Sequence, residues 1–139
     1  MNENIKKLVI VTGAARGIGL ATANLFETNG FAVALVDRDS NELKKCCIEN
    51  EVKKTFSFDI SNLNEVRLMF KSILDWHGRI DVLVNNAGVA DFGNIEDTSF
   101  ERWNTVMKTN LDGAFLCSQQ AIPYLKKTKG NIINIASIS

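Results

Sequence analysis

Continuously apolar runs alternate with segments of helical periodicity along the whole sequence, and only one proline interrupts them. A strand that is apolar without alternation is buried on both faces of its sheet. Strict alternation of strands and helices joins parallel strands through right-handed crossovers. The sequence therefore predicts a doubly wound α/β fold, a parallel five-stranded sheet with helices on both faces. The expected strands cover residues 8–13, 31–37, 55–59, 81–88 and 131–137.

Helical periodicity and capping signals define the expected helices. The first covers residues 17–29 and carries Ile18, Ala21, Leu25 and Phe26 along one apolar side. Capping signals precede the next two helices, and an apolar stripe runs through the last. These three are a helix over 43–49 after the pair Asp39 and Glu42, a helix over about 63–74 capped by Ser61, and a long helix over 100–127.

Composition limits the class of protein. At 139 residues with 45% hydrophobic residues, the chain has the size of one domain with one core, residues 1–139. Sixteen basic and sixteen acidic residues give no net charge, so we expect neither a nucleic-acid nor a membrane partner. The short apolar runs and the polar N-terminus favour a cytoplasmic protein. Three cysteines without a histidine cluster indicate neither a disulfide framework nor a metal site.

Three glycines, Gly13, Gly17 and Gly19, stand where the first strand passes into the first helix. In a doubly wound sheet, ligands bind beyond the carboxyl ends of the strands, and this turn is normally beside that point. Glycine permits a sharp turn and a close backbone approach, and free N–H groups at a helix start favour a phosphate. The spacing matches neither G-x-G-x-x-G nor a P-loop. A turn that only reverses the chain is the alternative.

Asp37 ends the second strand at about the distance beyond the glycines where a carboxylate accepts hydrogen bonds from an adenosine ribose. This carboxylate would repel a 2′-phosphate. Arg16 and Arg38 flank the same place and could instead pair with such a phosphate, or be solvated surface charges. We therefore expect NAD as cofactor, with NADP possible.

Together these motifs resemble the short-chain dehydrogenase/reductase family through essentially the whole chain. The resemblance implies an NAD(P)-dependent oxidoreductase that transfers a hydride between the nicotinamide cofactor and a small-molecule alcohol or carbonyl substrate. It also implies a homo-oligomer assembled through the long helix. The cofactor-binding residues that it implies are Thr12, Gly13, Arg16, Gly17, Ile18 and Gly19 in the turn, Asp37, the pair Asp59 and Ile60, and Asn86, Ala87 and Gly88 of the NNAG motif.

The resemblance places two catalytic residues, Asn110 and Ser137. Asn110 lies on the apolar stripe of the long helix, where a buried amide and the following Gly113 are both costly. The family uses the backbone of such an asparagine to hold a water of the proton relay. A satisfied core asparagine or a local helix irregularity is the alternative. Ser137 follows the last strand and would polarise the substrate oxygen; Ser139 is the weaker candidate.

The family's Tyr-x-x-x-Lys motif, which exchanges the proton, does not occur in the sequence. The single tyrosine, Tyr124, precedes Ser137 and has Thr128 four residues later. We therefore expect a truncated chain that binds the dinucleotide but turns over little. Two other hypotheses are a non-catalytic dinucleotide-binding or interaction module and, less favoured by the NNAG motif and Asn110, a Rossmann-like methyltransferase.

Overall fold

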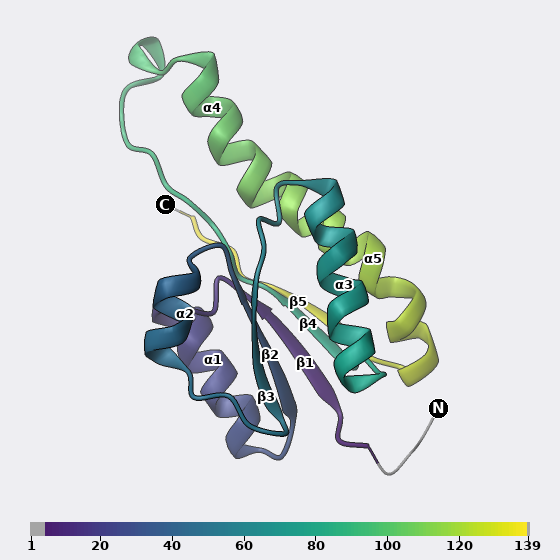
Figure 1. Ribbon diagram of the computed structural model, residues 1–139. Helices are drawn as coiled ribbons and strands as arrows, with labels where there is room; N and C mark the ends of the chain where they lie inside the picture. Colours follow the sequence, from purple (N-terminus) through teal and green to yellow (C-terminus); the bar gives the residue numbers. More distant parts are fainter. Residues whose placement is uncertain (1–4, 139) are drawn as a thin grey trace.

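The computed structural model describes residues 5–138, which form one parallel sheet covered by helices (Figure 1). The strand order is β3-β2-β1-β4-β5, so the chain reverses its direction of travel across the sheet after β3. The predicted doubly wound fold is confirmed. The strands are β1 (Leu8–Thr12), β2 (Ala32–Asp37), β3 (Lys53–Ser57), β4 (Val82–Asn85) and β5 (Asn131–Asn134). The helices are α1 (Gly17–Thr28), α2 (Ser40–Cys46), α3 (Leu63–His77), α4 (Phe100–Met107) and α5 (Gly113–Thr128).

Successive residues of β1 face opposite layers of the core. Leu8 and Ile10 belong to the apolar cluster beneath α3 and α5, whereas Val9 and Val11 belong to the cluster beneath α1 and α2. All five residues of β1 are buried, since helices cover both faces of the central strands. The sheet is thus the wall between two apolar layers, and its carboxyl-terminal edge remains open for a site.

The buried face of α1 differs from the predicted one. Ile18 and Leu25 are both 64% exposed, whereas Gly19 and Ala23 are buried against the sheet. Small residues let the helix approach the strands closely, so Ile18 and Leu25 point outward, while Leu20 and Phe26 pack against the core cluster. Of the predicted apolar side, Ile18, Ala21 and Leu25 are exposed and only Phe26 packs on the core, so the prediction was wrong for three of its four residues.

Two helix starts show how caps compete. Asp39 caps α2 as predicted, because its side chain accepts a hydrogen bond from the backbone N–H of Glu42. At α3 the cap is Asn62, not Ser61. The Ser61 hydroxyl donates instead to Asp59 Oδ1 at 2.7 Å, so the predicted cap was wrong by one residue.

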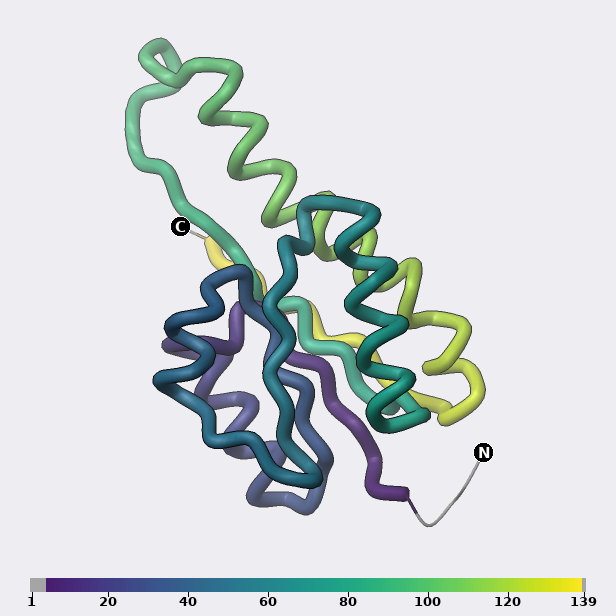
Figure 2. The backbone as a smooth tube through the Cα atoms, viewed as in Figure 1, coloured from purple at the N-terminus to yellow at the C-terminus, as the bar shows by residue number. Residues whose placement is uncertain are grey.

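The predicted long helix is a helical run with an interruption. A π-helical segment, η2 (Lys108–Asp112), separates α4 from α5. Before it, the loop after β4 passes through a short 3₁₀ turn, η1 (Ile95–Asp97), and returns as α4. We call residues 89–107 the arm, and Figure 2 shows that it extends away from the sheet. The apolar stripe predicted on this run is largely exposed in the arm, where Phe100 is 76% exposed.

Candidate functional site

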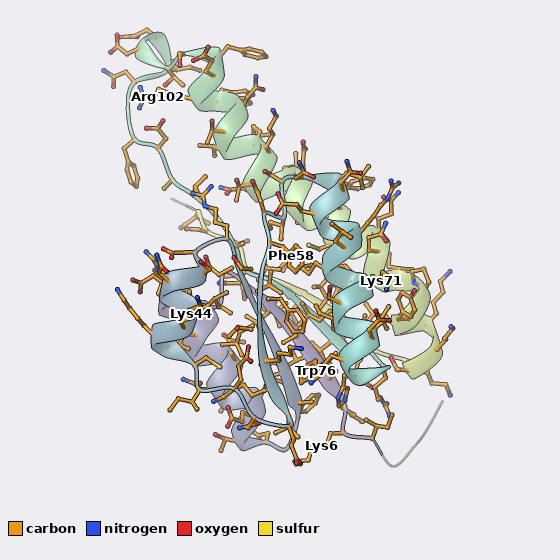
Figure 3. The ribbon with its side chains drawn as sticks, in the orientation of Figure 1. Lys6, Lys44, Phe58, Lys71, Trp76 and Arg102 are labelled. Atoms are coloured by element: carbon orange, nitrogen blue, oxygen red, sulfur yellow. The ribbon has the colours of Figure 1, made fainter. Side chains whose placement is uncertain are left out.

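A cleft of about 500 Å³ opens at the carboxyl ends of β1, β2 and β4, beside the point where the strand order reverses. Its walls come from the β1–α1 turn, the end of β2 and the residues after it, the segment after β3, the chain after β4 and Thr109 of η2. Phe58, labelled in Figure 3, lies on the segment that leads from β3 to α3. The lining residues are Gly13, Arg16, Ile18, Val36, Asp37, Arg38, Asp39, Phe58, Asp59, Ile60, Asn86, Ala87, Gly88, Val89 and Thr109.

The β1–α1 turn packs directly against the chain after β4. Gly13 has φ of 62°, and a Cβ there would lie 2.8 Å from the Ala87 Cα. A Cβ at Gly19 would collide with the Gly13 carbonyl and lie 2.5 Å from Asn86 Nδ2. At Gly17, with φ of 56°, nothing lies within 4 Å of such an atom. Gly19 therefore serves close packing, Gly17 serves the turn, and Gly13 serves both.

Thr12 and Asn86 join the turn to the NNAG segment. The buried Thr12 Oγ1 accepts hydrogen bonds from the backbone N–H groups of Asn86 and Ala87, both at 3.0 Å. In return, Asn86 Nδ2 donates to the Thr12 and Gly13 carbonyls at 3.1 and 3.2 Å. These bonds fix the position of the glycine turn relative to β4. Thr12 thus supports the cleft from beneath and is absent from its wall.

The two asparagines of NNAG have different tasks. Asn86 lines the cleft, but Asn85 is buried and points toward α5 and β5. Asn85 Nδ2 donates to Ser118 Oγ at 3.1 Å and to Asn134 Oδ1 at 3.0 Å. Asn85 therefore ties β4 to its neighbours in the sheet.

The start of α1 is open to an anion. The first turn of a helix carries N–H groups without intrahelical acceptors. At α1 no side chain caps them, because Arg16 occupies the N-cap position without a side-chain cap bond, and no acidic residue lies in the first turn. The positive end of the helix dipole therefore faces the cleft without a competing carboxylate from its own turn.

Acidic and basic side chains meet at the end of β2. Asp37 accepts hydrogen bonds from the backbone N–H groups of Ala15, at 3.2 Å, and Asp39, at 3.0 Å. Arg16 forms an ion pair with Asp39 at 2.9 Å. The Glu42 backbone N–H, and then the Arg16 guanidinium, hold the pKa of Asp39 below its usual value. Asp39 thus stays ionised beside Asp37.

Asp59 and Ile60 form the wall next to β3. Asp59 Oδ1 accepts hydrogen bonds from both the backbone N–H and the hydroxyl of Ser61, which fixes this carboxylate. Ile60 is buried, and a Cβ on Gly113 would lie 2.6 Å from its Cδ1. The glycine that follows η2 is therefore needed for close packing of α5 on this wall.

Asn110 lies in η2 and is exposed, so the expectation that it is buried was wrong. Its Oδ1 accepts from the Val89 N–H at 2.8 Å, and its Nδ2 donates to the Val89 carbonyl at 2.9 Å. Because both ends of the amide are engaged, Asn110 holds a residue of the cleft wall without lining the cleft itself. An interrupted helix at this position agrees with the irregularity that was the alternative prediction.

Ser137 lies after β5, exposed and absent from the cleft wall. The other serine considered, Ser139, falls outside the described residues. Three lining residues carried no motif and were not predicted: Val36, Phe58 and Thr109. Their common signal is position, since each directly adjoins a predicted site residue or the end of a strand. Asp39 and Val89 were also missed as wall residues, although Asp39 was predicted as a helix cap.

Cys117 and His77 lie outside the cleft and have structural surroundings. Burial raises the pKa of the Cys117 thiol to about 12, so it stays protonated and unreactive. His77 contacts the Lys6 carbonyl at 2.6 Å. Within residues 5–138, no cluster of three His, Cys, Asp or Glu side chains could hold a metal ion. None of the helices in the described part of the chain has the length and apolar character to cross a membrane.

The sequence is similar to that of a known protein family. The family model for short chain dehydrogenases matches residues 7–139. Meso-2,3-butanediol dehydrogenase of Serratia marcescens is 37% identical over 135 residues, which cover 96% of this chain and 54% of that protein. A 3-oxoacyl-acyl-carrier-protein reductase of Staphylococcus aureus is 36% identical over 138 residues and is 56% covered. The chain thus spans about half the length of the curated relatives it matches.

Solved structures show the same fold. The 3-ketoacyl-(acyl-carrier-protein) reductase of Brucella melitensis, complexed with NADH, has a TM-score of 0.89 at 30% identity over 94% of this chain and 57% of that one. An alcohol dehydrogenase of the archaeon Thermococcus sibiricus, complexed with 5-hydroxy-NADP, has a TM-score of 0.86 at 30% identity. The match covers 92% of this chain and 57% of the alcohol dehydrogenase chain.

Proposed function

The chain belongs to the short-chain dehydrogenase/reductase family, and on that premise we propose that its cleft binds a nicotinamide adenine dinucleotide for oxidoreduction of an alcohol or carbonyl substrate. The single observation that carries the proposal is that the uncapped start of α1 and the Asp37 carboxylate at the end of β2 lie at the same cleft. Gly17 and Ile18 begin that helix, and Asp37 stands opposite. A pyrophosphate binds to the free N–H groups of such a helix start, and ribose hydroxyls donate hydrogen bonds to such a carboxylate.

The residues present fit such a cofactor. At Gly17 the space beside the backbone is open, so a phosphate can approach the N–H groups of the turn. Asp37 uses its two oxygens for one backbone N–H each, and a carboxylate has about four acceptor sites. The remaining sites can accept the ribose hydroxyls. Asp59 and Ile60 supply a wall for the adenine, and Asn86, Ala87 and Gly88 supply the opposite side.

When bound, the nicotinamide would donate or accept the hydride. The chain's own residues bind and orient it, and two of them are proposed to act near the substrate. Val89 engages both side-chain groups of Asn110, so we propose that the Asn110 backbone carbonyl, and not its side chain, would hold a relay water. In η2 the backbone hydrogen bonds shift from the α-helical to the π-helical pattern, and such segments occur frequently at functional sites. Ser137 would orient the substrate oxygen.

Proton exchange would need a tyrosine with a lysine four residues later, which these 139 residues do not contain. Tyr124 is on α5 and packs against the core cluster, and the Thr128 hydroxyl donates to the Ile80 carbonyl. We therefore propose that residues 1–139 act as the dinucleotide-binding portion and turn over slowly, because loss of an acid–base group costs roughly 10²–10⁴ in rate. The exposed apolar residues on α4 and α5 support a homo-oligomer.

Calorimetric titration of the 139-residue chain with NAD⁺ tests the binding proposal. We expect saturable binding, and an Asp37→Ala variant should bind roughly 10-fold to 100-fold more weakly, as expected for hydrogen bonds to a charged group. Asp75→Ala on α3, outside the cleft, is the matched control and should bind like the parent chain. Absence of NAD⁺ and NADP⁺ binding would contradict the proposal, and S-adenosylmethionine binding in their place would favour the methyltransferase hypothesis.

Oxidoreduction is tested separately, with a panel of alcohols and carbonyls and NAD(H) absorbance as the readout. We expect very slow turnover by residues 1–139 and faster turnover by any longer natural form that contains Tyr-x-x-x-Lys. Equal and complete inactivity of both forms over a broad panel would favour the non-catalytic module.

A further inference from the structure

An ion pair at the mouth of the cleft holds one of its two arginines. Arg16 comes from the β1–α1 turn and Asp39 from the N-cap of α2, and both line the cleft. Arg16 Nη2 lies 2.9 Å from Asp39 Oδ2. Arg38, the other arginine of the wall, forms no ion pair within the described residues. The two arginines next to Asp37 are therefore not equivalent.

The carboxylate of this pair is fixed by backbone bonds. Asp39 Oδ1 accepts from the Glu42 N–H at 3.1 Å, and the Asp39 N–H donates to Asp37 Oδ1 at 3.0 Å. Helix capping and the end of β2 thus orient Asp39 before it meets Arg16. An exposed ion pair between two flexible side chains is usually weak, because both must be ordered. Here one partner is already ordered, so Arg16 has a defined position.

We propose that Asp39 is a specificity-determining residue, which disfavours a 2′-phosphorylated dinucleotide by engaging Arg16. The inference rests on the proposed function, because it requires the adenosine ribose to lie beside Asp37. For Arg16 to pair with a 2′-phosphate, it must first give up its ion pair with Asp39. Asp37 and Asp39 therefore favour NAD by two routes: one repels the phosphate, and the other withholds a cation from it.

Asp39→Asn tests the proposal because asparagine is an equally good N-cap, so α2 should be kept while the ion pair is lost. The measurement is calorimetric affinity of the 139-residue chain for NAD⁺ and NADP⁺. We expect Asp39→Asn to improve the NADP⁺ affinity by roughly fivefold relative to NAD⁺, the factor that corresponds to a strong exposed ion pair. Asp39→Ser, a second good cap without charge, should give the same result.

Two double variants and one control variant separate the mechanism from simple charge removal. In the Arg16→Gln background, Asp39→Asn should no longer improve the NADP⁺ preference, because the cation that it frees is missing. In the Arg38→Gln background the improvement should persist. Asp75→Asn removes the carboxylate of the exposed Lys71–Asp75 ion pair on α3 and should leave the preference between NADP⁺ and NAD⁺ unchanged.

The proposal is overturned if Asp39→Asn and Asp39→Ser leave the NADP⁺ to NAD⁺ ratio unchanged while NAD⁺ still binds. It is also overturned if the gain persists in the Arg16→Gln background, since Asp39 would then act through its own charge. In both cases NAD⁺ binding by the parent chain survives, and the proposed function with it. If the parent chain binds neither dinucleotide, the proposed function and this inference fall together.

Discussion

The glycine turn and the arm meet at the same cleft but are held in different ways. The turn is joined to the NNAG segment by the buried Thr12 Oγ1, which accepts from two backbone N–H groups, and by the partly buried Asn86 Nδ2, which donates to two carbonyls. The arm is exposed and is joined by side-chain contacts, from Asn110 to Val89 and from Arg102 to Asp91. Figure 3 shows Arg102 on the part that projects from the sheet.

This difference has a physical consequence. Groups bonded in a dry interior are costly to release, whereas exposed pairs exchange readily with water. Stability within one protein can range from nearly zero to the global value. We therefore expect the turn to open only with global unfolding and the arm to open locally. A fixed wall beside an adjustable loop agrees with the proposed function, in which the turn would hold the dinucleotide and the loop would adjust to the substrate.

The largest effect should come from adding one methyl group to each region. Gly19→Ala would place a Cβ against the Gly13 carbonyl and should lower the free energy of unfolding by about 3 kcal/mol, the upper part of the usual range for overpacking. At Gly93 in the arm, the nearest atom to a Cβ is Arg102 Nη2, at 3.5 Å. Gly93→Ala should therefore change stability by less than about 0.5 kcal/mol. Urea unfolding measures the stability of both variants. Equal losses in Gly19→Ala and Gly93→Ala would contradict the difference between the turn and the arm.

Removal of a hydroxyl should give the next largest contrast. Thr12→Val leaves the Asn86 and Ala87 N–H groups without their acceptor and should cost about 2 kcal/mol. Thr105 in the arm donates only to the Glu101 carbonyl of its own helix, so Thr105→Val should be nearly neutral. Thr12→Ser keeps the acceptor and should recover much of the loss. A neutral Thr12→Val would show that the turn does not depend on this hydroxyl.

The effect at Asn110 should be smaller and local. Asn110→Ala removes both bonds to Val89, at a cost of about 1 kcal/mol, and should speed amide hydrogen exchange at Val89. Asn104→Ala, in the same helical run, is the matched control and should leave that exchange rate unchanged. If Val89 exchanges at the same rate in both variants, Asn110 does not position this wall residue.

The smallest effect should be a pH dependence of the arm. Hydrogen bonding to the Arg102 guanidinium lowers the pKa of Asp91 below its usual value. The stabilisation is therefore present above the unfolded-state pKa, about 3.9, and is lost as the pH falls through the lowered folded-state pKa. Carbon NMR titration should show this low pKa, and Arg102→Gln should raise it toward the usual value. An unchanged pKa in Arg102→Gln would contradict the pairing.

Much of the fold could be predicted because its signals are local. Continuous apolar runs specify buried parallel strands, and the glycines and Asp37 meet backbone and charge requirements within one β-α-β unit. The face of α1 could not be predicted in this way. Which side is buried depends on how closely the helix approaches the sheet, and here the close approach selects Gly19 and Ala23 over Ile18 and Leu25.

The site was predicted less completely for related reasons. Ser61 and Asn62 are both good caps, and only the position of Asp59 decides between them. An apolar stripe does not reveal what covers it, so the exposure of the arm was not predictable. The shift to π-helical bonding at Asn110 leaves no mark in the periodicity, although the unfavourable pair Asn110 and Gly113 indicated an irregularity.

NMR chemical-shift mapping of NAD⁺ binding to the 139-residue chain tests the central claim most directly. We expect the largest amide shifts at Gly17, Ile18, Asp37 and Ile60 and small shifts at residues 91–105 of the arm. This pattern would assign the dinucleotide to the cleft beside the glycine turn. Shifts confined to the arm, or to the groove between α3 and α5 around Arg67 and Tyr124, would contradict the account.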